Sequence, residues 1–177
     1  MEKLSDKINL HIEKWVWITG NDSALEFVYF LESLGNKISF EDIYKFCNLK
    51  QKLEIRNTIS TAENCEQLAI EYKWKNNKIE DSSLFADAIL TLSLIIIDCY
   101  KNDGISDLTV FVGAESQLEL DYDKENVKIL IDSLNILNEY LTKFFGFSFY
   151  EIDDVETKES SIAILEIKQE LEKIISE

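Results

Sequence analysis

Residues 83–101 read Ser-Leu-Phe-Ala-Asp-Ala-Ile-Leu-Thr-Leu-Ser-Leu-Ile-Ile-Ile-Asp-Cys-Tyr-Lys, and this stretch decides the fold. Its apolar side chains recur at helical spacing and cover nearly every side of the helix that this spacing predicts. A helix that is apolar almost all round is buried on most of its sides. Asp103 and Gly104 follow at the point where such a helix should end. We therefore expect a central core helix, against which the rest of the 177-residue chain packs.

The chain before this helix predicts three further helices. The first covers residues 2–17, the second begins with Asp22 or Ser23 as its N-cap and ends before Gly35, and the third begins at Ser39 with a capping-box sequence. The segment 62–75 is ambiguous, because its end alternates like a strand while its composition suits a helix. We favour a helix for the segment 62–75, because the chain after Thr61 is rich in helix formers, and a strand remains open.

The chain after the core helix predicts a small sheet as well as helices. Segments 108–112 and 118–122 alternate apolar and polar residues around a glycine, which is typical of a β-hairpin. A helix over 124–145, a third strand over 147–152 and a last helix from about Ser160 follow. The predicted fold is α+β, a mostly helical single domain over 1–177 with a small β-sheet from the C-terminal half.

Charge limits the partners that this chain can take. It has 34 acidic and 18 basic side chains, for a net charge of −16, and no stretch is basic enough to bind nucleic acid directly. Three cysteines without metal-ligand spacing, no signal peptide and no apolar run long enough to span a bilayer predict a cytoplasmic protein that does not bind membranes.

The sequence contains no recognisable catalytic group of residues. His11 is the only histidine, and a general base needs a partner that orients it. There is no nucleophile motif and no glycine-rich phosphate loop, and the cysteines stand among apolar residues. We expect a protein that is not an enzyme and needs no cofactor or metal.

Two acidic segments are the candidate binding site. The predicted strand 118–122, helix 124–145 and strand 147–152 form a β-α-β unit, which would bring both segments to the same end of the sheet. The predicted partner-binding residues are Glu119, Asp121, Asp123, Asp153, Asp154 and Glu156.

Three interpretations of these acidic residues remain open. They form a protein-binding patch, solvated loops in which Asp123 is a helix cap, or a metal site. The spacing of Asp121, Asp123 and Glu125 resembles the start of a calcium loop, but the glycine and the final glutamate of such a loop are missing from the sequence that follows. Segments 108–112 and 147–150 carry few charges, so either could accept a partner strand if it lies at a sheet edge.

The segments Ile38-Ser39-Phe40-Glu41-Asp42-Ile43-Tyr44 and Ser83-Leu84-Phe85-Ala86-Asp87-Ala88, together with size, charge and layout, give the chain a family resemblance. It resembles bacterial immunity proteins of contact-dependent growth inhibition systems. The resemblance implies a cognate protein toxin, often a basic nuclease, which the immunity protein holds inactive. The alternative is a phage-type inhibitor, or an acidic DNA mimic, that acts on a nucleic-acid enzyme.

Overall fold

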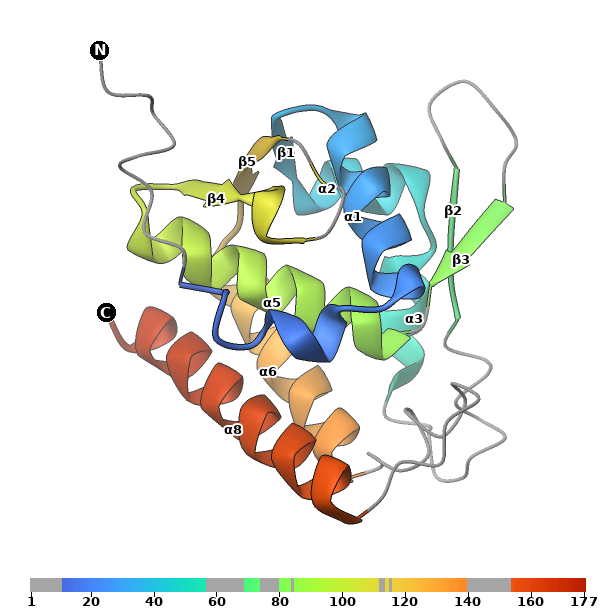
Figure 1. Cartoon of the computed structure of the whole chain (residues 1–177). Coiled ribbons are helices and arrows are strands. Elements are labelled where there is room, and N and C mark those ends of the chain that lie inside the picture. The colour runs from blue at the N-terminus through green and yellow to red at the C-terminus, as the bar shows by residue number, and fades with distance from the viewer. Residues whose placement is uncertain are drawn as a thin grey trace.

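Helix α5 (Phe85–Lys101) runs through the centre of the molecule in the computed structural model (Figure 1). The structure describes residues 11–56, 69–73, 80–83, 85–111, 114, 116–139 and 154–177. Every side chain from Phe85 to Cys99 is buried, which confirms the predicted core helix. Within the described residues, no helix is both long enough and apolar enough to cross a bilayer.

Two helices cover one side of α5. Helices α6 (Lys124–Glu139) and α8 (Asp154–Ser176) pack against each other and against α5 (Figure 1). They are antiparallel, because the Lys124 Nζ atom at the start of α6 donates to the Ile175 carbonyl at the end of α8 over 3.1 Å. The expected helix over 124–145 is confirmed to residue 139, and the last helix begins at 154, six residues earlier than expected. The predicted strand 147–152 lies outside the described residues.

A three-stranded sheet and helix α1 (Asp22–Leu34) lie on the other side of α5 (Figure 1). The strand order is β1 (Lys37–Ser39), β5 (Gln117–Asp121), β4 (Ile105–Asp107). Strand β5 is central, with β1 parallel and β4 antiparallel to it. The mostly helical α+β fold is therefore confirmed, but the sheet does not come from the C-terminal half alone, since β1 belongs to the first half.

The predicted strand at 108–112 is wrong over 108–111, and residue 112 lies outside the described residues. Residues Leu108–Val110 form a 3-10 turn, η4, and the strand of the hairpin lies earlier, at β4. Asp107 caps this turn, because its Oδ1 atom accepts from the Thr109 N–H over 3.0 Å and from the Thr109 hydroxyl over 2.6 Å. The side-chain cap offers the backbone an alternative to the strand ladder.

A second, two-stranded ribbon joins β2 (Ile70–Lys73) and β3 (Glu80–Ser83). The helix predicted over 62–75 is thus wrong at 70–73, and the rest of that segment lies outside the described residues. Ile70 and Tyr72 are buried while Glu71 and Lys73 are exposed, so the period of two that indicated a strand was the deciding signal. The Tyr72 ring stacks on Phe30 of α1 with 4.8 Å between ring centroids.

The predicted N-terminal helix is also wrong where the structure describes it. Residues 11–15 form turns and bends, and Val16–Thr19 form a 3-10 turn, η2. Long-range contacts hold this segment: the His11 N–H donates to the Asp98 carboxylate over 3.2 Å, and the Trp15 indole N–H donates to Glu166 over 2.8 Å. Ile12 and Trp15 still contribute to the core, as their apolar character indicated.

The two helix starts predicted before residue 50 are confirmed with small changes. Asn21, one residue before the predicted cap, caps α1 by accepting from the Ala24 N–H over 2.9 Å. Gly35 ends α1 with a φ of 128°, a conformation that glycine adopts without strain. Helix α2 (Phe40–Phe46) begins after Ser39 as expected, and a short helix α3 (Leu49–Ile55) follows it.

Helix α5 carries a buried carboxyl, Asp87, that predicts a pH effect on stability. Asp87 is 1% exposed; its Oδ1 atom accepts from the Asn21 amide over 3.0 Å, and its Oδ2 atom has no hydrogen-bond partner among the described residues. Burial raises the pKa of Asp87 above the ordinary value, because it disfavours the charged form. The stability that protonation contributes is therefore present below the unfolded-state pKa, about 3.9, and is lost as pH rises through the folded-state pKa.

We expect Asp87→Asn to become more stable, relative to the unchanged protein, as pH rises from about 4, and the difference to level off above the folded-state pKa. Urea unfolding of both proteins from pH 4 to 8 measures this difference. The exposed Glu139→Gln variant serves as the control and should change the free energy of unfolding by less than about 0.5 kcal/mol at each pH. A constant difference between Asp87→Asn and the unchanged protein would contradict the expectation.

Candidate protein-binding surface

The two acidic segments lie at opposite ends of the molecule. Asp121 and Asp123 precede the start of α6, whereas Asp154 and Glu156 lie at the start of α8, and the two helices are antiparallel. Helix α8 has 23 residues, which corresponds to a length of about 35 Å at 1.5 Å per residue. The prediction that both segments meet at one end is therefore wrong. Glu156 is exposed, and Asp153 lies outside the described residues.

The segment around Asp121 instead meets a segment from the first half of the chain. Strands β1 and β5 are parallel and Ser39 pairs with Asp121, so both strands deliver their following residues to the same end of the sheet. A hollow of about 220 Å³ lies there, which we call the acidic hollow. Its lining residues are Ser39, Phe40, Glu41, Asp121, Tyr122, Asp123 and Asn126.

Reciprocal caps fix the backbone on both sides of the acidic hollow. At the start of α2, the Ser39 N–H donates to the Asp42 carboxylate over 2.9 Å, and the Asp42 N–H donates to the Ser39 hydroxyl over 3.2 Å. At the start of α6, the Asp123 N–H donates to the Asn126 side-chain oxygen over 3.1 Å, and the Asn126 N–H donates to Asp123 over 2.8 Å. These caps satisfy N–H groups that helix ends otherwise leave unpaired.

Three exposed carboxylates line the acidic hollow. These are Glu41, Asp121 and Asp123, and none of the described lining residues is a lysine or an arginine. Burial raises the pKa of the nearby Tyr44 to about 12, and the charges of Glu41 and Asp123 add smaller contributions in the same direction.

Glu119, the first predicted site residue, has a separate role. It forms an ion pair with Lys37 across strands β5 and β1, and 45% of its side chain is exposed. An exposed pair of this kind contributes about 0–1 kcal/mol to stability. The lysine of this pair also interacts electrostatically with Asp121, so Lys37 offsets part of the negative charge at this end of the sheet.

The geometry does not favour a metal site. Among the described residues, no group of three or more histidine, cysteine or acidic side chains is arranged to hold a metal ion. The Oδ1 atom of Asp123 serves as the cap of α6.

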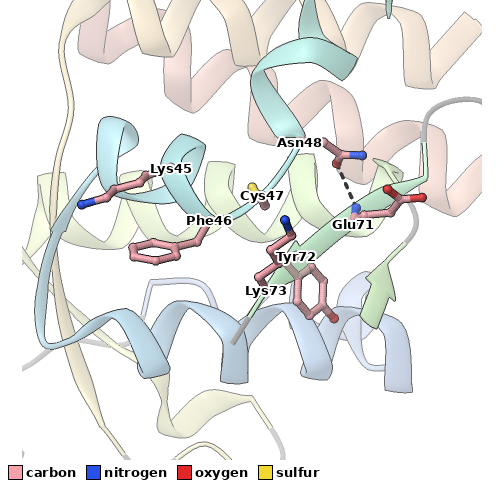
Figure 2. Close-up of a pocket in the computed structure, with 7 residues that line it drawn as sticks. All are labelled: Lys45, Phe46, Cys47, Asn48, Glu71, Tyr72 and Lys73. Atoms are coloured by element: carbon pink, nitrogen blue, oxygen red, sulfur yellow. Dashed lines mark hydrogen bonds between the residues drawn. The ribbon is translucent and has the colours of Figure 1, made fainter. Parts of the chain in front are cut away.

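A second hollow, of about 300 Å³, lies between the end of α2, the turn into α3 and strand β2 (Figure 2). Figure 2 shows its seven lining residues and the bond from the Glu71 N–H to the Asn48 side-chain oxygen, which measures 2.9 Å. Lys45 and Lys73 outnumber Glu71, the one carboxylate among these lining residues. This hollow therefore suits a cationic partner less well than the acidic hollow does.

The described cysteines have the properties of packed thiols. Cys47, which lines the hollow of Figure 2, is half-buried, and Cys99 is buried in α5. Burial raises the pKa of both thiols to about 11, so very little of either is thiolate at neutral pH.

Sequence reasoning missed Ser39 and Glu41 as neighbours of Asp121. The two segments are about eighty residues apart in the chain, and strand β1 has only three residues. The alternation of Lys37, Ile38 and Ser39 after the turn residues Gly35 and Asn36 was the available signal, but three residues give too short a pattern to assign a strand.

Comparisons of the chain with protein-family models, with curated proteins and with solved structures find no match.

Proposed function

We propose that this protein binds a basic protein toxin and neutralises it, in the manner of an immunity protein. The main support for this proposal is the charge imbalance. The chain has 34 acidic and 18 basic side chains, so at most 18 carboxylates can form one-to-one ion pairs within the chain and the others remain unpaired. Among the described residues, three of the exposed carboxylates line the acidic hollow without a cation beside them in its wall. Such a surface attracts a cationic protein over long range and mainly raises its association rate.

The DNA-mimic alternative has less support. A mimic needs carboxylates in a row at phosphate-like spacing along an elongated face. Helix α8 is the longest described element, but its exposed side carries Val155, Ile162 and Leu165, with exposed fractions of 62%, 51% and 42%. Apolar side chains among charged ones are typical of a protein-binding surface rather than a phosphate-like array.

Identification of the partner is the first test of this proposal. Cross-linking in the native host, followed by mass spectrometry, should yield a basic protein whose expression alone stops growth. Co-expression of the present protein should restore growth. A partner that is acidic, or whose activity is unchanged by an equimolar amount of this protein, would contradict the proposal.

The contribution of the acidic hollow is then tested by charge removal. We expect the variant Glu41→Gln/Asp121→Asn/Asp123→Asn to associate with the purified partner about three to ten times more slowly at low salt. The effect should shrink as salt rises, because the Debye length falls to about 8 Å at physiological strength. Asparagine at position 123 keeps a side chain that can cap α6. Surface plasmon resonance across a salt series measures both rates.

A matched control removes the same number of charges at the opposite end of α6 and α8. The variant Glu139→Gln/Glu156→Gln/Glu159→Gln changes exposed residues and should slow association less than the acidic-hollow variant does. Equal slowing by the two variants would show that only the total charge matters and that the acidic hollow is not the docking face.

A further inference from the structure

A third hollow, of about 350 Å³, lies between η2, the start of α1 and the segment after η4. We call it the Trp17 hollow. Its lining residues are Val16, Trp17, Thr19, Gly20, Asn21, Asp22, Leu25, Val110 and Phe111. Its size falls within the range of about 300–1,000 Å³ that is usual for ligand pockets.

Trp17 is the feature that distinguishes this hollow. Its side chain is 52% exposed, whereas Trp15, two residues earlier, is 6% exposed and hydrogen-bonded to Glu166. Tryptophan is one of the residue types most enriched at the energetic centres of protein interfaces. Phe111 forms a buried part of the wall, and Val16, Leu25 and Val110 are half-buried around it.

Among the described lining residues, Thr19 and Asn21 already have hydrogen-bond partners, and Asp22 is the one charged side chain. Thr19 donates to the Val16 carbonyl over 3.0 Å, and Asn21 is held by the Ala24 N–H and by Asp87. Asp22 is exposed, and among the described residues it takes part in no ion pair.

The one charged side chain among the described lining residues of the Trp17 hollow is acidic. None of the nine lining residues that the structure describes is basic, and Asp22, in the first turn of α1, supplies a carboxylate. An apolar wall, an exposed indole and a carboxylate together match one kind of side chain: a long apolar stem that ends in a planar cation.

We propose that the Trp17 hollow receives an arginine side chain of the basic partner. The arginine stem packs against the apolar wall, while the guanidinium stacks on the Trp17 ring and pairs with Asp22. This inference rests on the proposed function for the identity of the partner, but its test needs no partner.

The test uses two small probes that share a butyl stem: butylguanidinium, which is cationic, and butylurea, its neutral isostere. The protein is labelled with 5-fluorotryptophan, and the Trp17→Phe variant assigns the ¹⁹F resonance of Trp17. Butylguanidinium should shift this resonance saturably and bind roughly five-fold more tightly than butylurea, as a cation–π contact and an exposed ion pair would give together. The resonance of Trp15, which is 6% exposed, should remain in place.

Two variants locate the binding. Asp22→Asn should remove most of the preference for butylguanidinium, because it removes the carboxylate and keeps the shape of the side chain. Asp121→Asn, the matched control in the acidic hollow, should leave that preference unchanged. Equal affinity for the two probes, a preference that survives in Asp22→Asn, or no saturable shift would each overturn the proposal.

The outcomes of this test and of the partner test are distinguishable. If butylguanidinium binds as expected while the cross-linked partner is acidic, the proposed function fails and the cation site remains. If no probe binds while the basic partner is neutralised, the proposed function remains and the arginine contact is excluded.

Discussion

Replacing Leu92 or Ile96 with alanine should lower the free energy of unfolding by about 2–5 kcal/mol, the usual range for large-to-small changes in a packed core. Both side chains are 0% exposed in the middle of α5. Helices α1, α6 and α8 and strands β4 and β5 all pack on α5, so a cavity there is lined from several sides and cannot close by the movement of one element. Chemical denaturation measures the loss.

Leu165→Ala is the matched control for this prediction. It makes the same chemical change on the outer side of α8, where the leucine is 42% exposed. Its cost should stay below about 1 kcal/mol, because less apolar surface returns to water and no cavity forms. Losses below about 0.5 kcal/mol for both Leu92→Ala and Ile96→Ala would mean that α5 is not the centre of the core.

Elements with a strong local pattern were predictable from the sequence. The length and apolar character of 83–101 identified the core helix, and the capping sequence at Ser39 identified the start of α2. The alternation at 118–122 identified β5. In each case the residues that determine the structure lie within the element or next to it.

Elements that depend on distant partners were not predictable. Residues 11–15 have helical periodicity, but Asp98 and Glu166 bind His11 and Trp15 from positions about ninety and one hundred and fifty residues away. Strand β1 forms because β5 accepts it as a parallel neighbour, and nothing within three residues indicates that pairing.

The candidate site was half predictable for the same reason. Charge runs in the sequence identified Asp121 and Asp123 as exposed carboxylates, and they are exposed. Their neighbours depend on topology, which placed Glu41 beside them and Glu156 at the far end of the molecule. The charges along the chain therefore indicate which residues are exposed, but they do not show which of these residues lie next to one another in the folded protein.

Asp98, the second carboxyl in α5, differs from Asp87 because all of its hydrogen bonds join it to other segments or to the end of its own helix. Asp98 is 0% exposed and accepts three hydrogen bonds: from the His11 N–H over 3.2 Å, the Asn102 amide over 2.7 Å and the Asp107 N–H over 3.0 Å. It joins the end of α5 to the N-terminal segment and to β4. Burial raises its pKa, and these bonds offset only part of that effect.

We expect Asp98→Ala to lower the free energy of unfolding by about 2–5 kcal/mol at neutral pH, because each backbone N–H left unpaired in a buried place costs about 1–3 kcal/mol. Removal of the buried charge opposes this loss, but alanine supplies no acceptor for the three donors that Asp98 binds. Urea denaturation measures the total, and hydrogen exchange locates it: protection of the Asp107 amide should fall by more than the global loss of stability explains. If Asp98→Ala is as stable as the unchanged protein, or if Asp107 exchanges only by global unfolding, Asp98 does not hold β4 on α5. Asp87→Asn and Asp98→Ala are expected to differ for two reasons: Asp87 has an unpartnered oxygen and asparagine keeps an acceptor at its position, whereas Asp98 serves three donors and alanine supplies no acceptor.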